Sequence, residues 1–437
     1  MDRLGHAPTT ALSVHDLRHP LILAYRTLLI RSYRYIRIRK DVVMPDTPPP
    51  HPRLRRAALI SSGLLTLPGV AALALVLAPP LSWEGWQYAL LTLEFSLFLT
   101  LPALLGLLLS LSAGRGGRTR VTTGFATVNA LLLITALVPS ASLWNTARAE
   151  GAPLSLGEYT AGLATSTDRE PTTLTYHRVD GEELLMDVWE PASPGTEPLP
   201  VVVNVHGGAD DLPQSLLPRW DTWLADGDRV VFDVDYRFFP DGAWEESVAD
   251  VRCALGRVRE QAAEHGGDPE RIAVTGQSAG GLLALLATYD DRIPPSCDTE
   301  VPEATAVVAW YSATDGTADA PEVPWRQRRS PLGDELLESS ERMVGGPVME
   351  FPEEYEAMSP ILDVTGDSPA TLVVTAGHDL FVDPEDNRRF VARLAEAGVP
   401  HRHLELPWTE HMFDLNWGGL ASQITRHTID DFLTEHL

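Results

Sequence analysis

The serine best suited to nucleophilic chemistry lies in the five residues Gly276–Gly280. Ser278 stands at the centre of Gly-Gln-Ser-Ala-Gly, directly after the apolar run Ile272–Thr275 and directly before a stretch rich in leucine and alanine. A sharp turn from strand to helix presents such a hydroxyl above a sheet, and the flanking glycines keep Cβ atoms away from the neighbouring chain. We therefore predict that Ser278 is a nucleophile, the alternative being a serine that only caps a helix.

A second motif that suits acyl chemistry is His206-Gly207-Gly208, which follows the apolar run Val201–Val205. Glycines in such a loop can turn backbone N–H groups toward a tetrahedral oxyanion, and losing one such donor costs about 10²–10³ in turnover. The ring of His206 is expected to hold this loop in shape rather than to act as a base. We predict oxyanion donors at Gly207, Gly208, Ala209 and, directly after the serine, Ala279.

These motifs, together with Asp235-Tyr236-Arg237 and Pro240, resemble the hormone-sensitive-lipase and acetyl-esterase branch of the α/β-hydrolases. The resemblance covers roughly residues 170–437 and leaves out the N-terminal part of the chain. In that family the nucleophile, the acid and the base follow one another in this order. The resemblance implies that Asp379, in Gly377-His378-Asp379, is the acid and that His411, in His411-Met412-Phe413, is the base.

The chemistry of a serine nucleophile agrees with these two assignments. Histidine titrates near neutral pH and can accept the serine proton, while a carboxylate holds its tautomer and stabilises the imidazolium. The other candidate bases are His401 and His403, in a strand-like run, and His427, in a terminal helix. The rival acid, Asp383, precedes Pro384 and is expected to cap the following helix.

Two positions depart from the family pattern. Ala209, followed by Asp210, stands where a third glycine is usual, and Met412 stands where a glycine usually follows the base. Alanine keeps its backbone N–H, but an acid beside it disfavours an oxyanion. With Met412 in place of that glycine, the sequence does not determine the conformation of the loop that carries His411.

Three further side chains near these motifs have structural interpretations. Arg237 is expected to pair with a carboxylate such as Asp250 and so to fix the loop after its strand. Trp408 and Trp417 flank the His411 loop. They either line an acyl or alcohol pocket or, as is more usual for tryptophan, pack in the interior.

The elements expected to position these residues form an α/β-hydrolase sheet, mostly parallel, with helices on both faces. Leu174–Val179 and Leu184–Trp189 flank Asp180-Gly181 and predict a hairpin. The stretch Asp315–Ser359 interrupts the alternation of strands and helices and is interpreted as an insertion that could form a lid over a substrate pocket. Further strands are expected at Val201–Val205, Val230–Val234, Ile272–Thr275, Ala306–Trp310 and Leu372–Thr375, and helices at Trp244–His265, Gly281–Tyr289 and Asn387–Ala397.

Three apolar stretches precede this domain and predict three transmembrane helices within residues 57–143. Ala57–Ala78, Trp86–Leu111 and Val121–Leu143 contain no lysine or arginine, and each has the roughly 20 residues that cross a bilayer. The second carries one acid, Glu94. A cleavable signal peptide is not expected, because the first stretch begins only at residue 57. Residues 144–170 are interpreted as a linker, and residues 171–437 as the hydrolase domain.

Arginine sets the expected orientation, because cytoplasmic loops carry the excess of basic residues. The loop Pro79–Gly85 has no basic residue, and only Arg148 closely follows the third stretch. We therefore expect residues 1–56 in the cytoplasm and the hydrolase domain outside the cell membrane. Within residues 1–56, Leu17–Lys40 is either an interfacial helix on anionic lipid headgroups or a disordered basic arm. The deciding arginines are Arg53, Arg55 and Arg56 before the first stretch and Arg115, Arg118 and Arg120 between the second and third.

Basic and acidic residues are distributed unevenly between the N-terminal apolar region and the hydrolase domain. Up to residue 150 there are 15 basic and 7 acidic residues, and beyond it 19 basic and 53 acidic ones, within a net charge of −26. The acidic excess is interpreted as a solvated surface and disfavours binding of nucleic acid. Cys253 and Cys297 lack the spacing of a zinc site, so no metal is expected. They either pair, if outside the cytoplasm, or remain two buried thiols.

The sequence thus predicts a membrane-anchored serine hydrolase that works through an acyl-enzyme, without metal or organic cofactor. Its expected partners are membrane lipids and a small-molecule or lipid-like ester, with short acyl groups implied by the resemblance. A peptidase or acyltransferase of the same fold passes through the same intermediate. A domain that only binds partners, without catalysis, is the alternative from a different class.

Overall fold

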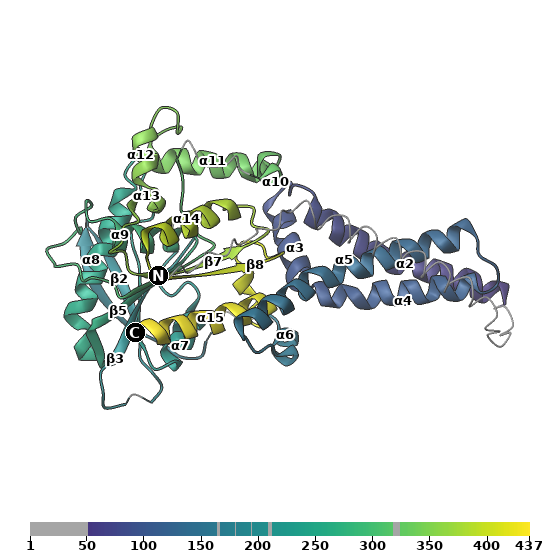
Figure 1. The fold of residues 1–437 in the computed structure, drawn as a ribbon, viewed down its shortest axis with the longest axis horizontal. Coiled ribbons are helices and arrows are strands. Elements are labelled where there is room, and N and C mark those ends of the chain that lie inside the picture. Colours follow the sequence, from purple (N-terminus) through teal and green to yellow (C-terminus); the bar gives the residue numbers. More distant parts are fainter. Residues whose placement is uncertain (1–50, 164–166, 180, 194, 209–211, 318–323) are drawn as a thin grey trace, which may run out of the picture.

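The computed structural model describes residues 51–163, 167–179, 181–193, 195–208, 212–317 and 324–437. The basic segment predicted at 17–40 lies outside these residues. Figure 1 shows an α/β domain from which a bundle of long helices projects. The chain enters through the bundle and ends in the α/β domain.

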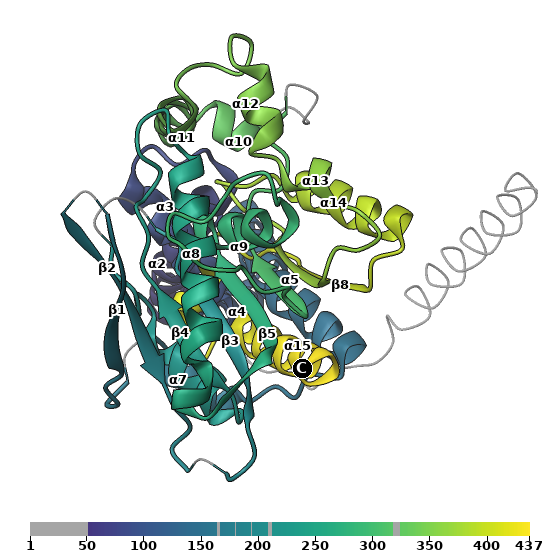
Figure 2. The same cartoon turned by 90° about the vertical axis from the view of Figure 1, so that its left-hand side faces the viewer.

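The α/β domain is built on one eight-stranded sheet with the order β1-β2-β4-β3-β5-β6-β7-β8. The predicted hairpin is β1 with β2, which are antiparallel; β2 is also antiparallel to β4, and every other pair is parallel. Figures 1 and 2 show the hairpin at one edge of the sheet and β8 toward the other. The strands are β1 (Thr172–Val179), β2 (Glu182–Trp189), β3 (Leu199–Val205), β4 (Val230–Val234), β5 (Gly267–Gln277), β6 (Ala306–Trp310), β7 (Ala370–Ala376) and β8 (His401–Leu406).

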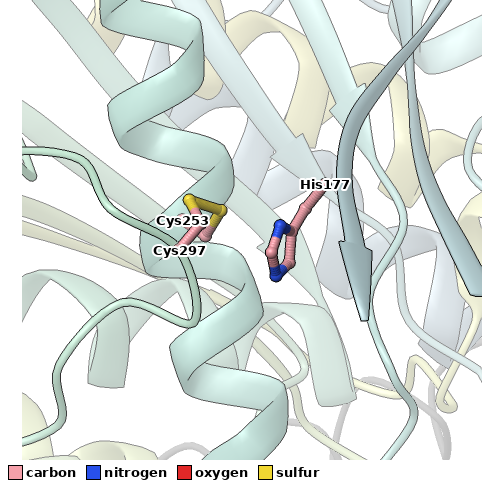
Figure 3. Close-up of side chains that lie close together, drawn as sticks. All are labelled: His177, Cys253 and Cys297. Atoms are coloured by element: carbon pink, nitrogen blue, oxygen red, sulfur yellow. A yellow bond between two sulfur atoms is a disulfide. The ribbon is translucent and has the colours of Figure 1, made fainter. Parts of the chain in front are cut away.

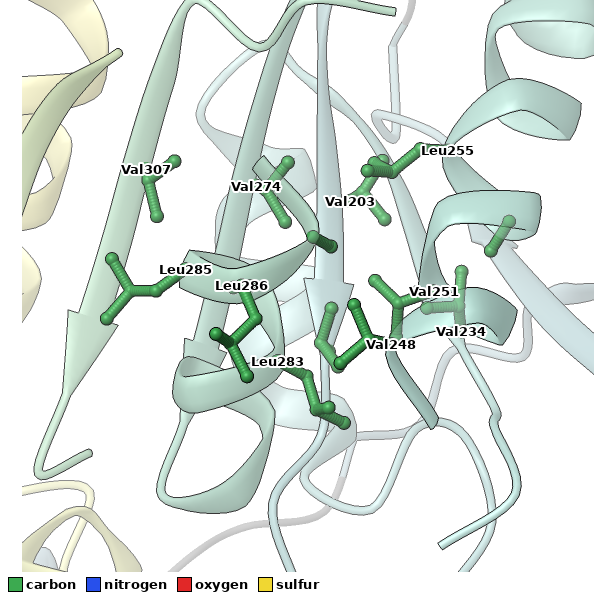
Figure 4. Packing of buried hydrophobic residues seen from close by; sticks show 14 of the residues in the cluster. Val203, Val234, Val248, Val251, Leu255, Val274, Leu283, Leu285, Leu286 and Val307 are labelled. Carbon is green, nitrogen blue, oxygen red and sulfur yellow. The ribbon is translucent and has the colours of Figure 1, made fainter. Parts of the chain in front are cut away.

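Helices cover both faces of this sheet because the parallel strands are apolar on both sides. Along β3, Val203 faces α8 and α9, whereas Val202 faces α7 and α15. Figure 4 shows Val203 of β3 and Val274 of β5 packed against leucines and valines of α8 and α9. The covering helices are α7 (Pro218–Asp226), α8 (Glu245–Gln261) with the 3₁₀ turn η2 (Ala262–His265), α9 (Ala279–Tyr289), α14 (Pro384–Ala397) and α15 (Leu420–His436).

Three helices of the bundle are long and apolar enough to cross a membrane: α2 (Pro52–Leu77), α4 (Ser96–Gly114) and α5 (Arg120–Glu150). Inside the bundle, Asn129 of α5 donates hydrogen bonds to Thr66 and Ser62 of α2 at 2.9 and 3.3 Å. Ser62 in turn contacts Ser110 of α4 at 2.6 Å. Such polar contacts help transmembrane helices to associate, because the hydrophobic effect does not drive their association within apolar lipid.

The prediction of one continuous second helix over Trp86–Leu111 is wrong. The chain turns at Phe95, which separates α3 (Trp83–Glu94) from α4. The acid supplies the physical reason, because Glu94 is buried and accepts a hydrogen bond from Asn416 of the α/β domain at 3.2 Å. Helix α3 therefore packs on the α/β domain, and within this stretch α4 is the part that is long and apolar enough to cross a membrane.

Residues 144–170, expected to be a linker, are largely helical up to Ala161. Helix α5 runs on to Glu150 because its last turns pack on the α/β domain, where Leu143 and Ala147 are buried. Glu150 pairs with Arg402 of β8 at 2.6 Å, and the short helix α6 (Leu156–Ala161) follows. The bundle is thus joined to the domain by a helix rather than by an irregular chain.

The insertion predicted at 315–359 holds α10 (Trp325–Arg328), α11 (Pro331–Val344) and α12 (Pro352–Ala357), followed by α13 (Pro360–Asp363). Its helices contact the segment that joins α2 to α3. The hydroxyl of Ser330 donates to the carbonyl of Pro80 at 2.6 Å, and the indole of Trp83 donates to Glu335 at 2.9 Å. The insertion therefore touches the bundle near the start of α11.

The two cysteines form a disulfide that joins α8 to the loop after α9. Figure 3 shows Cys253 and Cys297 bonded to each other beside His177 of β1. These three residues are close enough to share a metal ion, with ligand atoms within 4.8 Å of one another. Because each sulfur is bonded to the other, they do not offer two thiolates.

Candidate active site

Ser278 stands on a tight turn between the end of β5 and the start of α9. Its φ of 54° and ψ of −122° are unusual for a residue with a side chain and are typical of a strained elbow. Glycines make the turn possible: a Cβ on Gly276 would lie 2.4 Å from the carbonyl oxygen of Gly280, and one on Gly280 would lie 2.0 Å from that of Val205. The turn presents the serine at the carboxyl ends of the strands.

The structure brings the three residues proposed for nucleophile, base and acid into one hydrogen-bonded row. The Oγ of Ser278 lies 2.9 Å from Nε2 of His411, and Nδ1 of His411 lies 2.8 Å from Oδ2 of Asp379. An imidazole protonated on Nδ1 donates to Asp379 and accepts the serine proton at Nε2. His411 and Asp379 are both buried, in loops that follow β8 and β7.

Asp379 is held in place by its own loop. Its Oδ1 accepts hydrogen bonds from the backbone N–H groups of Phe381 and Val382 at 2.8 and 3.1 Å. This leaves Oδ2 for the imidazole. The carboxylate is thereby oriented before any substrate binds.

Glu410 is a site residue that sequence reasoning missed. It is fully buried and accepts a hydrogen bond from the N–H of Leu380 at 2.6 Å, which ties the base loop to the acid loop. Arg326 of the insertion reaches Glu410 at 3.4 Å and also donates to the carbonyl of His378. Burial, and after it the charge of Asp379, raises the pKa of Glu410 to about 7. No motif marks it; its position next to the base was the only available signal.

Two of the residues predicted as oxyanion donors lie against the elbow. Gly207 is so close that a Cβ on it would stand 2.5 Å from the carbonyl oxygen of Gln277 and 3.1 Å from the Cβ of Ser278. Ala279 is the first residue of α9. Gly208 has a φ of +133°, which favours glycine, while Ala209 lies outside the described residues.

His206 has the structural surroundings expected for it. Its Nδ1 donates to the carbonyl of Gly207 at 2.9 Å, and its ring stacks on Tyr236 with centroids 4.8 Å apart. Burial by itself lowers the pKa of this imidazole, but the nearby carboxylates of Asp235 and Asp233 outweigh it, so the pKa is raised. Its Nε2 lies 3.7 Å from Oδ1 of Asp235. The ring fixes the glycine loop.

The predicted pair of Arg237 and Asp250 is present and bidentate, with distances of 2.8 and 3.0 Å. Arg237 therefore fixes the loop after β4, as expected. Of the two tryptophans, Trp417 is buried among aromatic rings and beneath Arg219 and Arg426. Trp408 instead stacks on His378, with ring centroids 5.6 Å apart.

The rival residues lie in the elements expected for them, away from the serine. His401 and His403 belong to β8, and His427 belongs to α15. Asp383 caps α14, accepting from the N–H of Glu385 at 2.9 Å. Met412 has a φ of 59° and a ψ of 30°, so it adopts the left-handed conformation that the usual glycine would adopt freely.

Helix α3 brings aromatic side chains close to the base. Phe381 contacts the ring of His411 with centroids 4.8 Å apart, and Trp86 contacts Phe381 at 4.9 Å. Trp86 is buried together with Leu90, Leu332 and Leu380. The N-terminal bundle therefore contributes to the surroundings of the site, which sequence reasoning did not anticipate.

Comparisons with known proteins agree with this fold. Residues 186–394 match the family model described as BD-FAE. A thermophilic esterase from Thermogutta terrifontis, solved with butyrate bound, is 25% identical with a TM-score of 0.50, over 61% of this chain and 94% of that one. The C-terminal domain has the α/β-hydrolase fold. The match to BD-FAE includes Ser278 and Asp379 but ends before His411.

Several esterases of Mycobacterium tuberculosis are similar to the hydrolase domain. Esterase LipC is 33% identical over 267 residues, which are 59% of this chain and 63% of that protein. Carboxylesterase NlhH is 33% identical over 159 residues, which are 35% of this chain and 48% of that protein. The chain thus spans less than two thirds of the length of these relatives.

Proposed function

We propose that this chain is a membrane-anchored carboxylesterase. Ser278 attacks the ester carbonyl as His411 accepts its proton, and Asp379 stabilises the imidazolium. His411 then returns the proton to the leaving alcohol, which departs and leaves an acyl-serine. Water, deprotonated by His411, releases the carboxylic acid and restores the serine.

The observation that carries this proposal is the hydrogen-bonded row of Ser278, His411 and Asp379, with distances of 2.9 and 2.8 Å. A non-catalytic binding domain has no need of a strained serine aligned with a buried, oriented imidazole. The similarity to LipC and NlhH, named as esterases, supports an ester over a peptide as substrate. Butyrate bound to the Thermogutta esterase supports a short acyl group at the serine.

Oxyanion stabilisation is assigned to backbone N–H groups of the glycine loop and of the elbow. Gly207 packs on the elbow, and Ala279 opens α9, whose N-terminus favours developing negative charge. Gly208 and Ala209 complete the proposed set.

The hydrolase domain is proposed to lie outside the cytoplasm. The arginines cluster at the end of the bundle remote from the domain (Figure 1), where Arg55 of α2 donates to the carbonyl of Gly117 at 2.7 Å. Basic loops stay in the cytoplasm, which puts the other end outside. The disulfide between Cys253 and Cys297 agrees, because disulfides persist in oxidising compartments.

The test is to purify the full chain in detergent and treat it with a fluorophosphonate probe. We expect covalent labelling and hydrolysis of p-nitrophenyl butyrate, both lost in Ser278→Ala. Aminopeptidase substrates should not be turned over. A folded wild-type protein that neither takes the label nor hydrolyses any ester would overturn the proposal in favour of a binding domain.

A further inference from the structure

A partly open apolar cavity of about 220 Å³ lies within the domain-proximal part of the helix bundle. Its walls come from α2, α3, α4 and α5, and one residue of the hydrolase domain, Trp408, completes them. Only three of its fifteen lining residues carry a hydroxyl: Thr92, Ser96 and Thr135. Ser96 is bonded to Ser140, and Thr135 donates to the carbonyl of Leu132, so both polar groups are already satisfied.

A cavity of this kind favours an apolar guest. An engineered apolar cavity of about 150 Å³ stays dry and binds benzene, since water finds no polar partners there. The present cavity is larger and equally poor in free polar groups. A single hydrocarbon chain fits its chemistry, whereas a charged or sugar-like group does not.

The loop that carries the proposed base contributes one residue, Trp408, to the wall of the cavity. Trp408 precedes His411 by three residues and stacks on His378, which directly precedes Asp379. His378 is tied to the bundle, because its Nε2 donates to the carbonyl of Val76 at 3.1 Å, and Val76 itself lines the cavity. Trp408 and His378 therefore connect the cavity to the loops that carry His411 and Asp379.

We propose that this cavity binds the hydrocarbon chain of a membrane-lipid ester whose carbonyl reaches Ser278. The inference rests on the proposed esterase function and names its substrate class. The surroundings supply such molecules, because the outer faces of α2, α4 and α5 expose large apolar side chains suited to lipid. Leu67, Leu101 and Leu131 are examples, with 63%, 61% and 57% of their surfaces exposed.

Adjacent alanines on α2 provide a matched test. Ala72 lines the cavity and is 8% exposed, whereas Ala71 is exposed on the outside of the same helix. Ala72→Phe fills the cavity, and Ala71→Phe adds the same ring on the lipid-facing side. Ala136→Phe, on the opposite wall in α5, repeats the test at an independent position.

Two series of esters test whether the hydrocarbon chain in the cavity belongs to the acyl group or to the alcohol of the substrate. The first runs from p-nitrophenyl butyrate to the palmitate, and the second from butyl acetate to hexadecyl acetate. We expect Ala72→Phe to lower kcat/KM for the longest member of one series about tenfold relative to its shortest member. Ala71→Phe should leave the ratio unchanged, and retained cleavage of the short esters shows that the variant is folded.

A binding measurement separates failure of this inference from failure of the esterase function. Ser278→Ala is photolabelled with a diazirine-bearing palmitic acid, and label on the peptide that carries Trp408 is measured. We expect that label to fall in the Ala72→Phe background and to persist in the Ala71→Phe background. Unchanged chain-length ratios together with equal labelling overturn the cavity proposal, whether or not the protein cleaves esters.

Discussion

At the scale of single residues, the site is organised around carboxylates that the fold keeps out of water. Asp379 receives two backbone N–H groups on one oxygen and the imidazole of His411 on the other. Glu410, one residue before the base, joins the two loops through Leu380. The first carboxylate orients the imidazole, and the second orients the loops.

Asp379→Asn should lower kcat by about 10³–10⁴ with little change in KM, because an amide holds the wrong tautomer of His411. Steady-state kinetics with p-nitrophenyl butyrate measures this. Asp383→Asn is the matched control, since asparagine still caps α14 and the side chain lies outside the row. Equal losses in both variants would show that Asp379 has no special part in the reaction.

Glu410 should make stability depend on pH. Its folded-state pKa of about 7 lies above the ordinary value of 4.5, so the stabilising effect of its proton is fully present below about pH 4.5 and is lost as pH rises through 7. Thermal unfolding of the wild type and of Glu410→Gln between pH 5 and pH 8 tests this. We expect the decline in Tm toward pH 8 to be shallower in the variant; parallel curves would contradict the assignment.

At the scale of elements, α3 is the unexpected component. With 12 residues it is too short to cross a membrane, and it covers the loop between Asp379 and Val382, where Trp83 and Trp86 contact Phe381. Helix α11 of the insertion covers its other side through Leu332. A hydrolase domain without the N-terminal bundle would therefore lose the side chains of α3 that pack near His411.

Trp86→Ala should destabilise the docked α3 by about 3–5 kcal/mol, because it removes a large side chain that is only 3% exposed. We also expect lower kcat/KM, since Phe381 loses the ring that supports it against His411. Denaturant unfolding and ester hydrolysis provide the two measurements. Tyr88→Ala, on the exposed face of the same helix, should change neither by much.

At the scale of the whole molecule, the bundle and the hydrolase domain form one continuous body. Helix α5 passes from the bundle into contact with α15, and Glu150 at its end pairs with Arg402. Arg53, Arg55 and Arg56 lie at the start of α2, and Arg115 and Arg118 lie between α4 and α5, at the end of the bundle remote from the hydrolase domain.

Cysteine labelling tests the orientation, because the two native cysteines are bonded to each other. We expect a membrane-impermeant maleimide to label Glu303→Cys in intact cells and to label Arg118→Cys only after permeabilisation. Both sites are exposed, at opposite ends of the molecule. The reverse pattern would place the hydrolase domain in the cytoplasm.

The disulfide should contribute about 4 kcal/mol to stability, since it closes a loop of 44 residues in the unfolded chain. Replacing both Cys253 and Cys297 by serine should lower the free energy of unfolding by roughly that amount, or by 2–4 kcal/mol if strain intervenes. Denaturant titration of the hydrolase activity measures it. An unchanged midpoint would show that the pair is not oxidised in the protein.

Local signals were enough to predict the strands, the elbow at Ser278 and the three apolar stretches. Each depends on periodicity, glycine spacing or hydrophobic length, which neighbouring residues determine among themselves. The pairing of Arg237 with Asp250 and the capping role of Asp383 were predicted on similar grounds. The resemblance to the family implied Asp379 and His411, and in the structure His411 lies beside the serine and Asp379 beside His411.

Tertiary structure alone decided the rest. The break at Phe95 depends on a hydrogen bond from Asn416, more than 300 residues away in sequence, to Glu94. Glu410, Trp86 and the cavity beside Trp408 have no motif, because their meaning lies in which distant surfaces meet. Contacts between segments far apart in the chain are set by the packing of the whole fold, and no local pattern encodes them.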